Sequence, residues 1–377
     1  MKKKKEIIIF SGYFLPFLGG IERYTDMLSK NLIDQNCNVT IVSSNYNNLP
    51  EKELIDGINI IRIPIFTIFK NRYPIPKNSK IVKELQNNKY DIIICNTRFQ
   101  LTTLLGIKLS KKTKTPLLVI DHSSSHFSVD NKLLDFFGAI YEHILTYYIK
   151  CNVKYFYGVS KRCNEWLKHY KILATGVIYN SIDKSLYKKN KDRHFIEERK
   201  NKIILTYSGR LIKEKGLYLL CDAYKNLVKK YPNLELYIAG DGPILDDLKK
   251  KYTNVHILGK LKFDELLPLY NDTDIFVYPS MYPEGLPTSI LEAGIMKCAV
   301  IATDRGGTTE VITSEEYGLI MEENQESLEE NIIKYITNKE LLNNNKENLH
   351  TRIIKNFTWD ETAKKLLKEM NKLKKQS

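Results

Sequence analysis

Short apolar runs alternate with amphipathic helical patterns along almost the whole chain of 377 residues. Strands and helices that alternate in this way are typical of a parallel sheet covered by helices on its faces. The chain therefore predicts an α/β protein. The runs that we interpret as buried strands are Ile7–Phe10, Val39–Ser43, Ile58–Ile63, Asp91–Cys95, Leu117–Ile120, Tyr155–Val159, Ile203–Tyr207, Leu234–Ala239, Val255–Leu258, Ile275–Tyr278 and Val300–Ala302.

A polar, charged stretch near residues 184–200 interrupts the alternation and divides the chain into two halves. A chain of this length usually forms two domains, each with a core of its own. We therefore predict two Rossmann-like domains, over residues 1–185 and 200–355, with a last helix over residues 359–375 that packs back on the first domain. In such sheets ligands bind beyond the carboxyl ends of the strands.

Two glutamates, Glu284 and Glu292, flank the start of a predicted helix in the second half. The free N–H groups at that helix start, at Thr288 and Ser289, favour a diphosphate. Glu284 could then accept hydrogen bonds from a sugar and Glu292 from a ribose. The alternative is a solvated loop glutamate and a surface helix glutamate. Together the two glutamates would span a nucleotide sugar, which we call the donor. The residues of this segment that we expect to contact it are Glu284, Gly285, Leu286, Pro287, Thr288 and Glu292.

Two cations follow the predicted strand that ends near Gly209. The planar guanidinium of Arg210 suits a phosphate, and Lys215 supplies a point charge. Together they could stabilise the charge that develops on a departing nucleoside diphosphate without a metal ion. The alternative is an arginine at a strand end and a lysine on the surface. In the first half, Gly19 and Gly20 could let the backbone approach the donor phosphates or the acceptor, or could form an ordinary turn.

In their order and spacing, these segments resemble the retaining glycosyltransferases of the GT-B fold, specifically family 4 (group 1) of the bacterial capsule, O-antigen and lipopolysaccharide type. The resemblance covers nearly the whole chain and implies two Rossmann-like domains whose parallel sheets face a central cleft. The segments that carry it are Gly19-Gly20-Ile21-Glu22, Asp121-His122, Val159-Ser160-Lys161, Asn180-Ser181-Ile182-Asp183, Ser208-Gly209-Arg210 with Lys215-Gly216, residues 239–243, the two glutamates, and Gly306-Gly307 with Glu310.

The resemblance implies transfer of a sugar from a nucleoside-diphosphate sugar, with UDP favoured over GDP, to a glycan or a polyprenyl-diphosphate-linked acceptor in cell-surface polysaccharide synthesis. Family members are thought to retain the anomeric configuration by front-face attack, in which the departing diphosphate accepts the proton of the incoming hydroxyl. No enzymic nucleophile, cofactor or metal is then expected. The catalytic residues implied here are His122, Glu284, Arg210 and Lys215, and His126 is the expected acceptor contact, although the sequence does not rank the two histidines.

Charge is distributed unevenly, because residues 1–190 hold 29 Lys and Arg against 15 Asp and Glu. A basic domain can bind nucleic acid, an acidic substrate or an anionic membrane. The resemblance favours the inner surface of the cytoplasmic membrane, and we expect no nucleic acid. No apolar run reaches the roughly 20 residues of a membrane span, so we expect a cytoplasmic or peripheral protein. Residues 131–149 could line an acceptor groove, lie on the membrane, or form an interdomain or core helix.

Two other classes of protein remain open on the sequence alone. One is a GT-B enzyme that epimerises or phosphorolyses nucleotide sugars, and the other is a non-enzymatic protein that binds membrane or nucleic acid. A dehydrogenase is disfavoured, because Gly240-Asp241-Gly242 is too short for a dinucleotide fingerprint. Asp272 and Asp274 resemble an Asp-x-Asp metal motif, but they precede a buried strand, so we expect no metal there.

Overall fold

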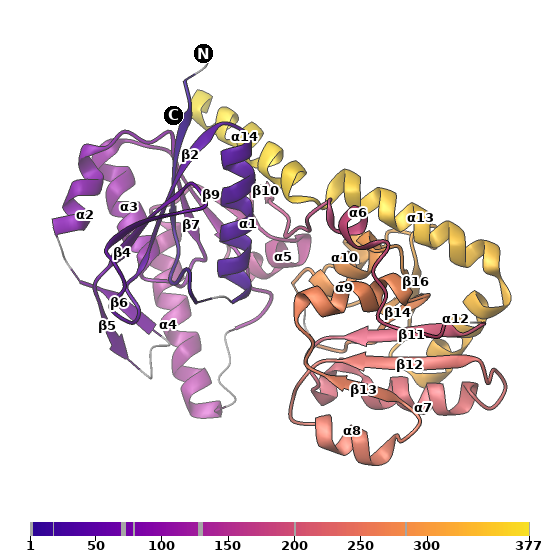
Figure 1. Cartoon of the computed structure of the whole chain (residues 1–377). Coiled ribbons are helices and arrows are strands. Elements are labelled where there is room, and N and C mark those ends of the chain that lie inside the picture. Colours follow the sequence, from indigo (N-terminus) through magenta and orange to yellow (C-terminus); the bar gives the residue numbers. More distant parts are fainter. Residues whose placement is uncertain are drawn as a thin grey trace. The chain divides into compact units, whose positions relative to one another are not determined.

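The computed structural model describes residues 3–17, 19–68, 73–77, 80–126, 131–199, 201–282 and 285–376. The chain forms two compact units (Figure 1). Unit 1 comprises Met1–Asn180 and Trp359–Ser377, and unit 2 comprises Ser181–Thr358. Both are built around a mainly parallel sheet, so the predicted α/β class is confirmed. No helix in the described ranges is long and apolar enough to cross a membrane.

The sheet of unit 1 has eight strands in the order β10-β9-β8-β7-β1-β2-β4-β3. Its neighbouring strands pair in parallel, except that β3 pairs antiparallel with β4. The strands are β1 (Lys5–Phe10), β2 (Cys37–Ser44), β3 (Lys52–Ile55), β4 (Ile58–Ile63), β7 (Ile92–Asn96), β8 (Leu117–Asp121), β9 (Tyr155–Gly158) and β10 (Gly176–Val177), and β5 (Ile65–Ile68) and β6 (Tyr73–Pro76) form a separate hairpin.

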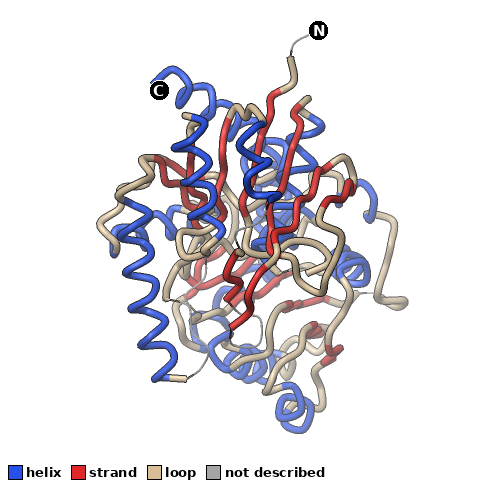
Figure 2. Tube along the Cα trace, turned by 90° about the vertical axis from the view of Figure 1, so that its left-hand side faces the viewer, coloured by secondary structure: helices blue, strands red, loops and turns tan. Residues whose placement is uncertain are grey.

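Helices cover both faces of this sheet, which explains why its central strands are apolar throughout (Figure 1 and Figure 2). Ile7 and Ile9 of β1 lie in the cluster that contains Leu28 of α1, whereas Ile8 and Phe10 lie in the cluster on the opposite face. The helices are α1 (Gly20–Asp34), α2 (Lys80–Glu84), α3 (Thr102–Thr113), α4 (Lys132–Lys150), α5 (Lys161–His169) and α14 (Trp359–Gln376), with a 3-10 turn at Leu85–Asn87.

The last helix, α14, packs against α1 although more than 300 residues separate them in the chain. The side-chain amide of Gln35 donates a 3.1 Å hydrogen bond to the carbonyl of Asp360 at the start of α14. Trp359, Leu366 and Met370 of α14 share one apolar cluster with Tyr24 of α1. The C-terminal segment is therefore part of the core of unit 1.

Unit 2 contains a six-stranded parallel sheet in the order β13-β12-β11-β14-β15-β16. The strand order reverses between β11 and β14, and such a switch point opens a crevice at the carboxyl ends of the strands. The strands are β11 (Ile203–Ser208), β12 (Leu234–Ala239), β13 (His256–Gly259), β14 (Ile275–Tyr278), β15 (Ala299–Thr303) and β16 (Leu319–Met321). The helices are α6 (Leu186–Asn190), α7 (Leu217–Leu227), α8 (Leu245–Lys251), α9 (Phe263–Asp272), α10 (Thr288–Ile295), α11 (Thr308–Val311), α12 (Gln325–Thr337) and α13 (Lys339–Asn356), with a 3-10 turn at Lys213–Lys215.

Candidate active site

A pocket of about 540 Å³ lies at the carboxyl ends of β11, β12 and β14 in unit 2. This is the switch point of the sheet, where a ligand is expected. Five predicted residues, Arg210, Leu286, Pro287, Thr288 and Glu292, lie together in its wall. The complete lining is Ser208, Gly209, Arg210, Ala239, Gly240, Asp241, Lys260, Leu261, Leu266, Tyr278, Leu286, Pro287, Thr288, Ser289 and Glu292.

Glu292 lies in the second turn of α10, and its side chain is buried in the pocket wall. The hydroxyl of Tyr270 on α9 lies 3.4 Å from its Oε2 atom. Tyr270 also makes a short hydrogen bond to the hydroxyl of Ser208 at the end of β11. These contacts fix a carboxylate at the pocket, where it can accept hydrogen bonds from hydroxyl groups of a ligand.

The N-terminus of α10 opens at the same pocket. Because the helix begins at Thr288, the N–H groups of Thr288 and Ser289 lie in its first turn, where N–H groups have no acceptor within the helix itself. Pro287 occupies the N-cap position and brings no N–H of its own. An anion in the pocket would receive two backbone donors and the positive end of the helix dipole.

Arg210 and Lys215 supply positive charge in two different environments. Arg210 is exposed and lines the pocket. Lys215 is buried beside it, and its ammonium group donates a 2.9 Å hydrogen bond to the hydroxyl of Tyr278. Burial and the nearby Arg210 lower the pKa of Lys215 to about 8. At pH 7 Lys215 is therefore mostly protonated, and about half of its charge is lost at about pH 8.

Two glycines allow the backbone to pass closely beside the pocket. A Cβ at Gly216, whose φ is +70°, would lie 2.1 Å from the carbonyl oxygen of Pro279. A Cβ at Gly240, whose φ is +154°, would lie 1.9 Å from the carbonyl oxygen of Gly209. Only glycine fits these conformations at such short distances. The loops that follow β11, β12 and β14 can therefore converge.

Glu284, the predicted sugar contact, lies outside the described residues. The neighbouring Gly285 is described, and its carbonyl accepts a 2.6 Å hydrogen bond from the N–H of Gly307. This bond joins the loop before α10 to the turn before α11. Leu286 is buried, and its Cδ1 atom lies 2.8 Å from where a Cβ on Gly307 would stand. The Gly306-Gly307 segment thus supports Gly285 and Leu286 before α10.

In unit 1, His122 directly follows β8 and packs edge-on against the ring of Tyr24, with the ring centroids 4.7 Å apart. Its Nε2 atom is buried and has no hydrogen-bond partner among the described residues. Burial lowers the pKa of His122 to about 3. The imidazole is therefore neutral at pH 7 and can exchange a hydrogen bond with a ligand.

Gly19 and Gly20 begin helix α1 of unit 1. The N–H of Gly19 donates a 3.0 Å hydrogen bond to the carboxylate of Glu22, which closes the first turn of the helix. Among the described residues, a Cβ at Gly20 would meet nothing within 4 Å. The close approach of a ligand to this backbone stays a prediction.

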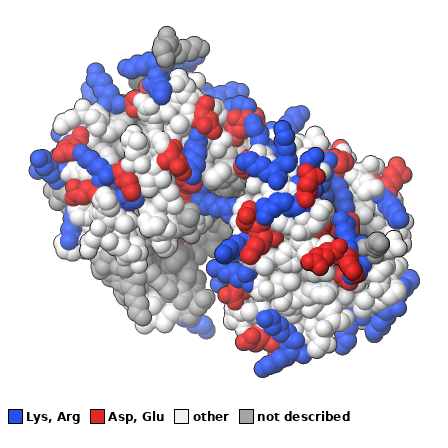
Figure 3. Space-filling view, viewed as in Figure 1, with Lys and Arg blue, Asp and Glu red and all other residues white. Residues whose placement is uncertain are grey.

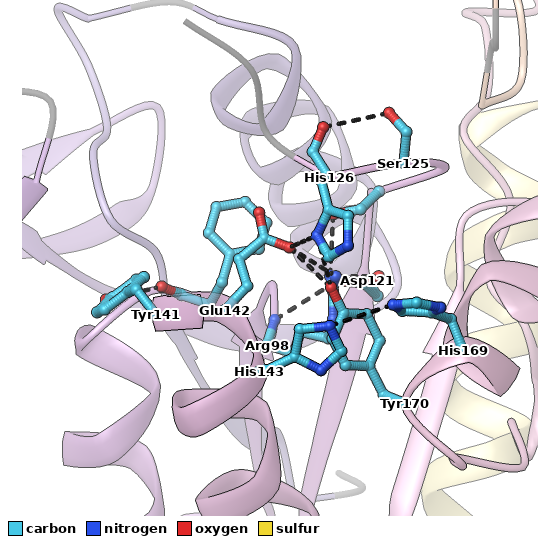
Figure 4. A network of polar contacts seen from close by, with 11 residues as sticks. Arg98, Asp121, Ser125, His126, Tyr141, Glu142, His143, His169 and Tyr170 are labelled. Atoms are coloured by element: carbon cyan, nitrogen blue, oxygen red, sulfur yellow. Dashed lines mark hydrogen bonds and ion pairs between the residues drawn. The ribbon is translucent and has the colours of Figure 1, made fainter. Parts of the chain in front are cut away.

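His126 is half-buried and contacts a polar network that the sequence analysis did not predict (Figure 4). Its Nδ1 atom is 3.1 Å from Oε2 of Glu142 on α4. The buried Arg98, which follows β7, bonds both carboxylate oxygens of Asp121 at 3.1 Å and Oε2 of Glu142 at 3.2 Å. Two charged residues at the ends of neighbouring strands, Arg98 and Asp121, were the signal that could have revealed this network. A contact between His126 and an acceptor stays a prediction.

The carboxylates of the Asp-x-Asp segment hold the residues before β11 in place. Asp272 accepts hydrogen bonds from the N–H groups of Phe195 and Ile196 at 2.7 and 2.9 Å. Asp274 forms ion pairs with Arg199 at 2.6 Å and with Lys346 at 2.9 Å. The segment thus has a structural role on the side of the sheet where β14 begins, at the end opposite to the pocket.

The sequence matches two family models that follow one another along the chain. Residues 18–186 match Glycosyltransferase Family 4, and residues 188–352 match Glycosyl transferases group 1. An uncharacterized glycosyltransferase of Methanocaldococcus jannaschii is 28% identical, with 98% of this chain and 99% of that protein aligned. The UDP-Gal:alpha-D-GlcNAc-diphosphoundecaprenol alpha-1,3-galactosyltransferase of Escherichia coli is 22% identical, over 96% of this chain and 94% of that protein.

Solved structures with a similar fold cover nearly the whole chain. Sucrose-phosphate synthase from Thermosynechococcus elongatus has a TM-score of 0.75 at 20% identity, over 99% of this chain and 100% of that one. HepE of Anabaena, solved with UDP and glucose, has a TM-score of 0.70 at 18% identity, over 98% of this chain and 100% of that one. These similarities confirm the predicted GT-B fold.

Proposed function

Because the chain is a glycosyltransferase of the GT-B fold, with a family 4 domain followed by a group 1 domain, we propose that it transfers a sugar from a UDP-sugar to a hydroxyl group of a lipid-linked glycan. The transfer retains the anomeric configuration of the sugar. The donor binds in the pocket of unit 2, and the acceptor binds to unit 1. The reaction belongs to the synthesis of a cell-surface polysaccharide at the inner face of the cytoplasmic membrane.

The observation that carries this proposal is the convergence of complementary groups in one pocket of unit 2. The helix terminus at Thr288 suits a diphosphate, the exposed Arg210 suits its oxygens, and the buried Glu292 suits ribose hydroxyls. The predicted role of Glu284 at the donor sugar belongs to the same proposal. UDP is favoured because HepE was solved with UDP and glucose and because the name of the Escherichia coli relative specifies a UDP-galactose donor.

The chemistry requires stabilisation of a leaving diphosphate more than it requires an enzymic nucleophile. The bond between the anomeric carbon and the diphosphate oxygen breaks, and its electron pair stays on the diphosphate. Arg210, Lys215 and the α10 terminus offset this charge. The acceptor oxygen bonds to the same face of the sugar, and its proton passes to the departing diphosphate oxygen. The neutral His122 orients the reacting hydroxyls.

The acceptor is proposed to be held at a membrane, and helix α4 supports this. Its side chains Phe136, Phe137 and Ile144 are 61%, 59% and 68% exposed, and the same helix exposes Leu133, Leu134, Ile140, Tyr147 and Tyr148. A core helix does not expose so many apolar side chains, whereas a helix that lies on a bilayer does. The +14 net charge of residues 1–190 favours anionic lipids. Figure 3 shows Lys, Arg, Asp and Glu side chains interspersed on this face of the molecule.

One experiment tests the reaction as a whole. The purified protein is incubated with UDP-glucose, UDP-galactose or UDP-N-acetylglucosamine and with an acceptor that carries a sugar on a lipid diphosphate. Products are separated by mass spectrometry, and the anomeric configuration of the new bond is read by NMR. We expect one donor to give an α-linked product from an α-linked donor. An inverted linkage, or an epimerised sugar formed without acceptor, would contradict the proposal.

A further inference from the structure

Three histidines of unit 1 gather at one place, although they come from three separate segments (Figure 4). His126 lies in the segment after β8, His143 is on α4, and His169 is the last residue of α5. One ring nitrogen from each histidine lies within 4.8 Å of the others. The three ring centroids are 5.0 to 5.5 Å apart, so the rings form a nearly equilateral triangle. We propose that His126, His143 and His169 bind a Zn²⁺ ion.

The spacing of the nitrogens fits a tetrahedral ion. Zinc binds imidazole nitrogen at about 2.0 to 2.1 Å, so two such ligands in a tetrahedron lie about 3.3 Å apart. The Nε2 atoms of His143 and His169 are 3.2 Å apart. One ring nitrogen of His126 lies within 4.8 Å of the other two, so the ring of His126 must move closer to bind the same ion. A simple hydrogen bond between His143 and His169 would explain the 3.2 Å between their Nε2 atoms. It would not explain why the ring of His126 lies beside them.

The partners of His126 prepare its outer nitrogen for a metal. The hydroxyl of Tyr170 donates its hydrogen to Oε2 of Glu142 at 2.8 Å. The Nδ1 atom of His126 faces this carboxylate and this hydroxyl, each at 3.1 Å. Nδ1 must therefore carry the proton, which leaves the lone pair on Nε2. A carboxylate that holds the far nitrogen of a ligating histidine is the usual support of zinc sites.

The surroundings hold the rings in place and leave the site accessible. Glu142 is buried and is itself fixed by Arg98 at 3.2 Å. The ring of Trp166 stacks on that of His169, with the centroids 4.7 Å apart and the planes 5° apart. His143 and His169 are exposed, so an ion can enter from solvent. Three histidines leave one position for water, and all-imidazole ligation suits zinc or a similar transition ion more than Mg²⁺ or Ca²⁺.

The ion would join α4, α5 and the segment after β8. That segment also contains His122, so an occupied site would fix the position of the proposed catalytic histidine. The site lies in unit 1, and none of its three histidines lines the proposed donor pocket of unit 2. We therefore expect that removing the metal leaves UDP binding unchanged, and the zinc site can be tested without any knowledge of the sugar substrate.

Cobalt spectroscopy and zinc competition test the proposal on the full chain, freed of any histidine tag and stripped with a chelator. We expect one equivalent of Co²⁺ to give the intense visible absorption of tetrahedral cobalt, and one equivalent of Zn²⁺ to remove it. In competition with a chromophoric chelator, His143→Ala and His169→Ala should each weaken zinc binding at least about 10- to 100-fold. His256→Ala, which removes an exposed histidine of unit 2, is the matched control and should bind zinc as the unaltered chain does.

The results that would overturn the proposal are equally specific. The unaltered chain could give only the weak absorption of octahedral cobalt, or bind no zinc in competition with the chelator. Alternatively, both alanine variants could bind zinc as tightly as the control. Because the side chains of His143 and His169 are exposed, the variants should fold, and circular dichroism verifies this before the titration. The cobalt spectrum of the unaltered chain decides the question without any variant.

Discussion

The ammonium group of Lys215 donates a 2.9 Å hydrogen bond to the hydroxyl of Tyr278, which ends the neighbouring strand β14. Lys215 also lies 5.2 Å from the ring centroid of Tyr278 and 5.4 Å from that of Tyr282. The lysine is thus held among aromatic rings beside the donor pocket. Burial makes its charge costly there, and the nearby positive charge of Arg210 adds to that cost, so the pKa of Lys215 is lowered.

We predict that UDP binding weakens as the pH rises from 7 to 9. The free protein has a Lys215 pKa of about 8, and a bound diphosphate raises that pKa because it favours the charged form. When the pH is below the Lys215 pKa of the free protein, the lysine is charged in both the free and the UDP-bound protein, so the UDP affinity is constant. When the pH is above that pKa, Lys215 must take up a proton as UDP binds, and the UDP affinity falls by at most about tenfold per pH unit. Calorimetry measures this, and Lys215→Met should bind weakly with no such slope.

Glu292→Gln should weaken UDP binding about 10- to 100-fold, because the carboxylate that we propose accepts hydrogen bonds from the ribose becomes a neutral amide. Glu292 and its partner Tyr270 are buried, so a thermal melt is needed to show that the variant folds. Glu326→Gln is the matched control, because Glu326 is an exposed glutamate in the first turn of α12. If Glu292→Gln and Glu326→Gln bind UDP with equal affinity, Glu292 does not contact the nucleotide.

Gly240→Ala should destabilise the protein by more than about 1 to 3 kcal/mol, since φ is +154° and the new Cβ would lie 1.9 Å from the carbonyl oxygen of Gly209. Gly138→Ala, in the middle of helix α4, is the control, because a Cβ there would meet no other part of the described chain within 4 Å. That control should be neutral or stabilising by about 0.5 to 1 kcal/mol. Chemical denaturation measures both, and a tolerated alanine at position 240 would contradict the close approach of the two loops.

The gathering of Arg210, Thr288 and Glu292 at one pocket of unit 2 could be predicted because these residues follow strands. Arg210 follows β11, and Thr288 and Glu292 belong to the helix after β14, so the parallel sheet brings them to one edge. The histidine cluster could not be predicted in this way. His143 and His169 lie on two helices, and their meeting depends on how α4 and α5 pack, which no local pattern encodes. The burial of Lys215 likewise depends on Tyr278, which lies 63 residues away in the chain.

The packing of α4 likewise could not be predicted from its apolar pattern. Residues 131–149 have the composition of a core helix and also that of a membrane-surface helix, and only the packing distinguishes the two. In the structure Leu145 and Ile149 face the core, while Phe136, Phe137 and Ile144 face outward. The sequence predicted the helix but not how much of its surface the rest of the chain covers.

His122→Asn should lower kcat about 10- to 100-fold and leave UDP affinity unchanged, because His122 belongs to unit 1 and the donor pocket to unit 2. The pKa of His122 is about 3, so its protonation should not shape the pH–rate profile between pH 5 and 8. Steady-state kinetics with the lipid-linked acceptor measure both quantities. A variant with the same loss of UDP affinity as Glu292→Gln would show instead that His122 acts on the donor.

The double variant Phe136→Ser, Phe137→Ser should bind vesicles that contain anionic lipid at least about tenfold more weakly, since two exposed rings no longer enter the bilayer. Stability should change little, because both rings already face solvent. Leu173→Ser is the matched control, as Leu173 is 85% exposed in unit 1 but lies outside α4. Sedimentation with vesicles measures the binding, and vesicles of neutral lipid test the contribution of charge. If α4 instead covers an acceptor groove, the double variant should raise KM for the acceptor and leave vesicle binding equal to that of the control.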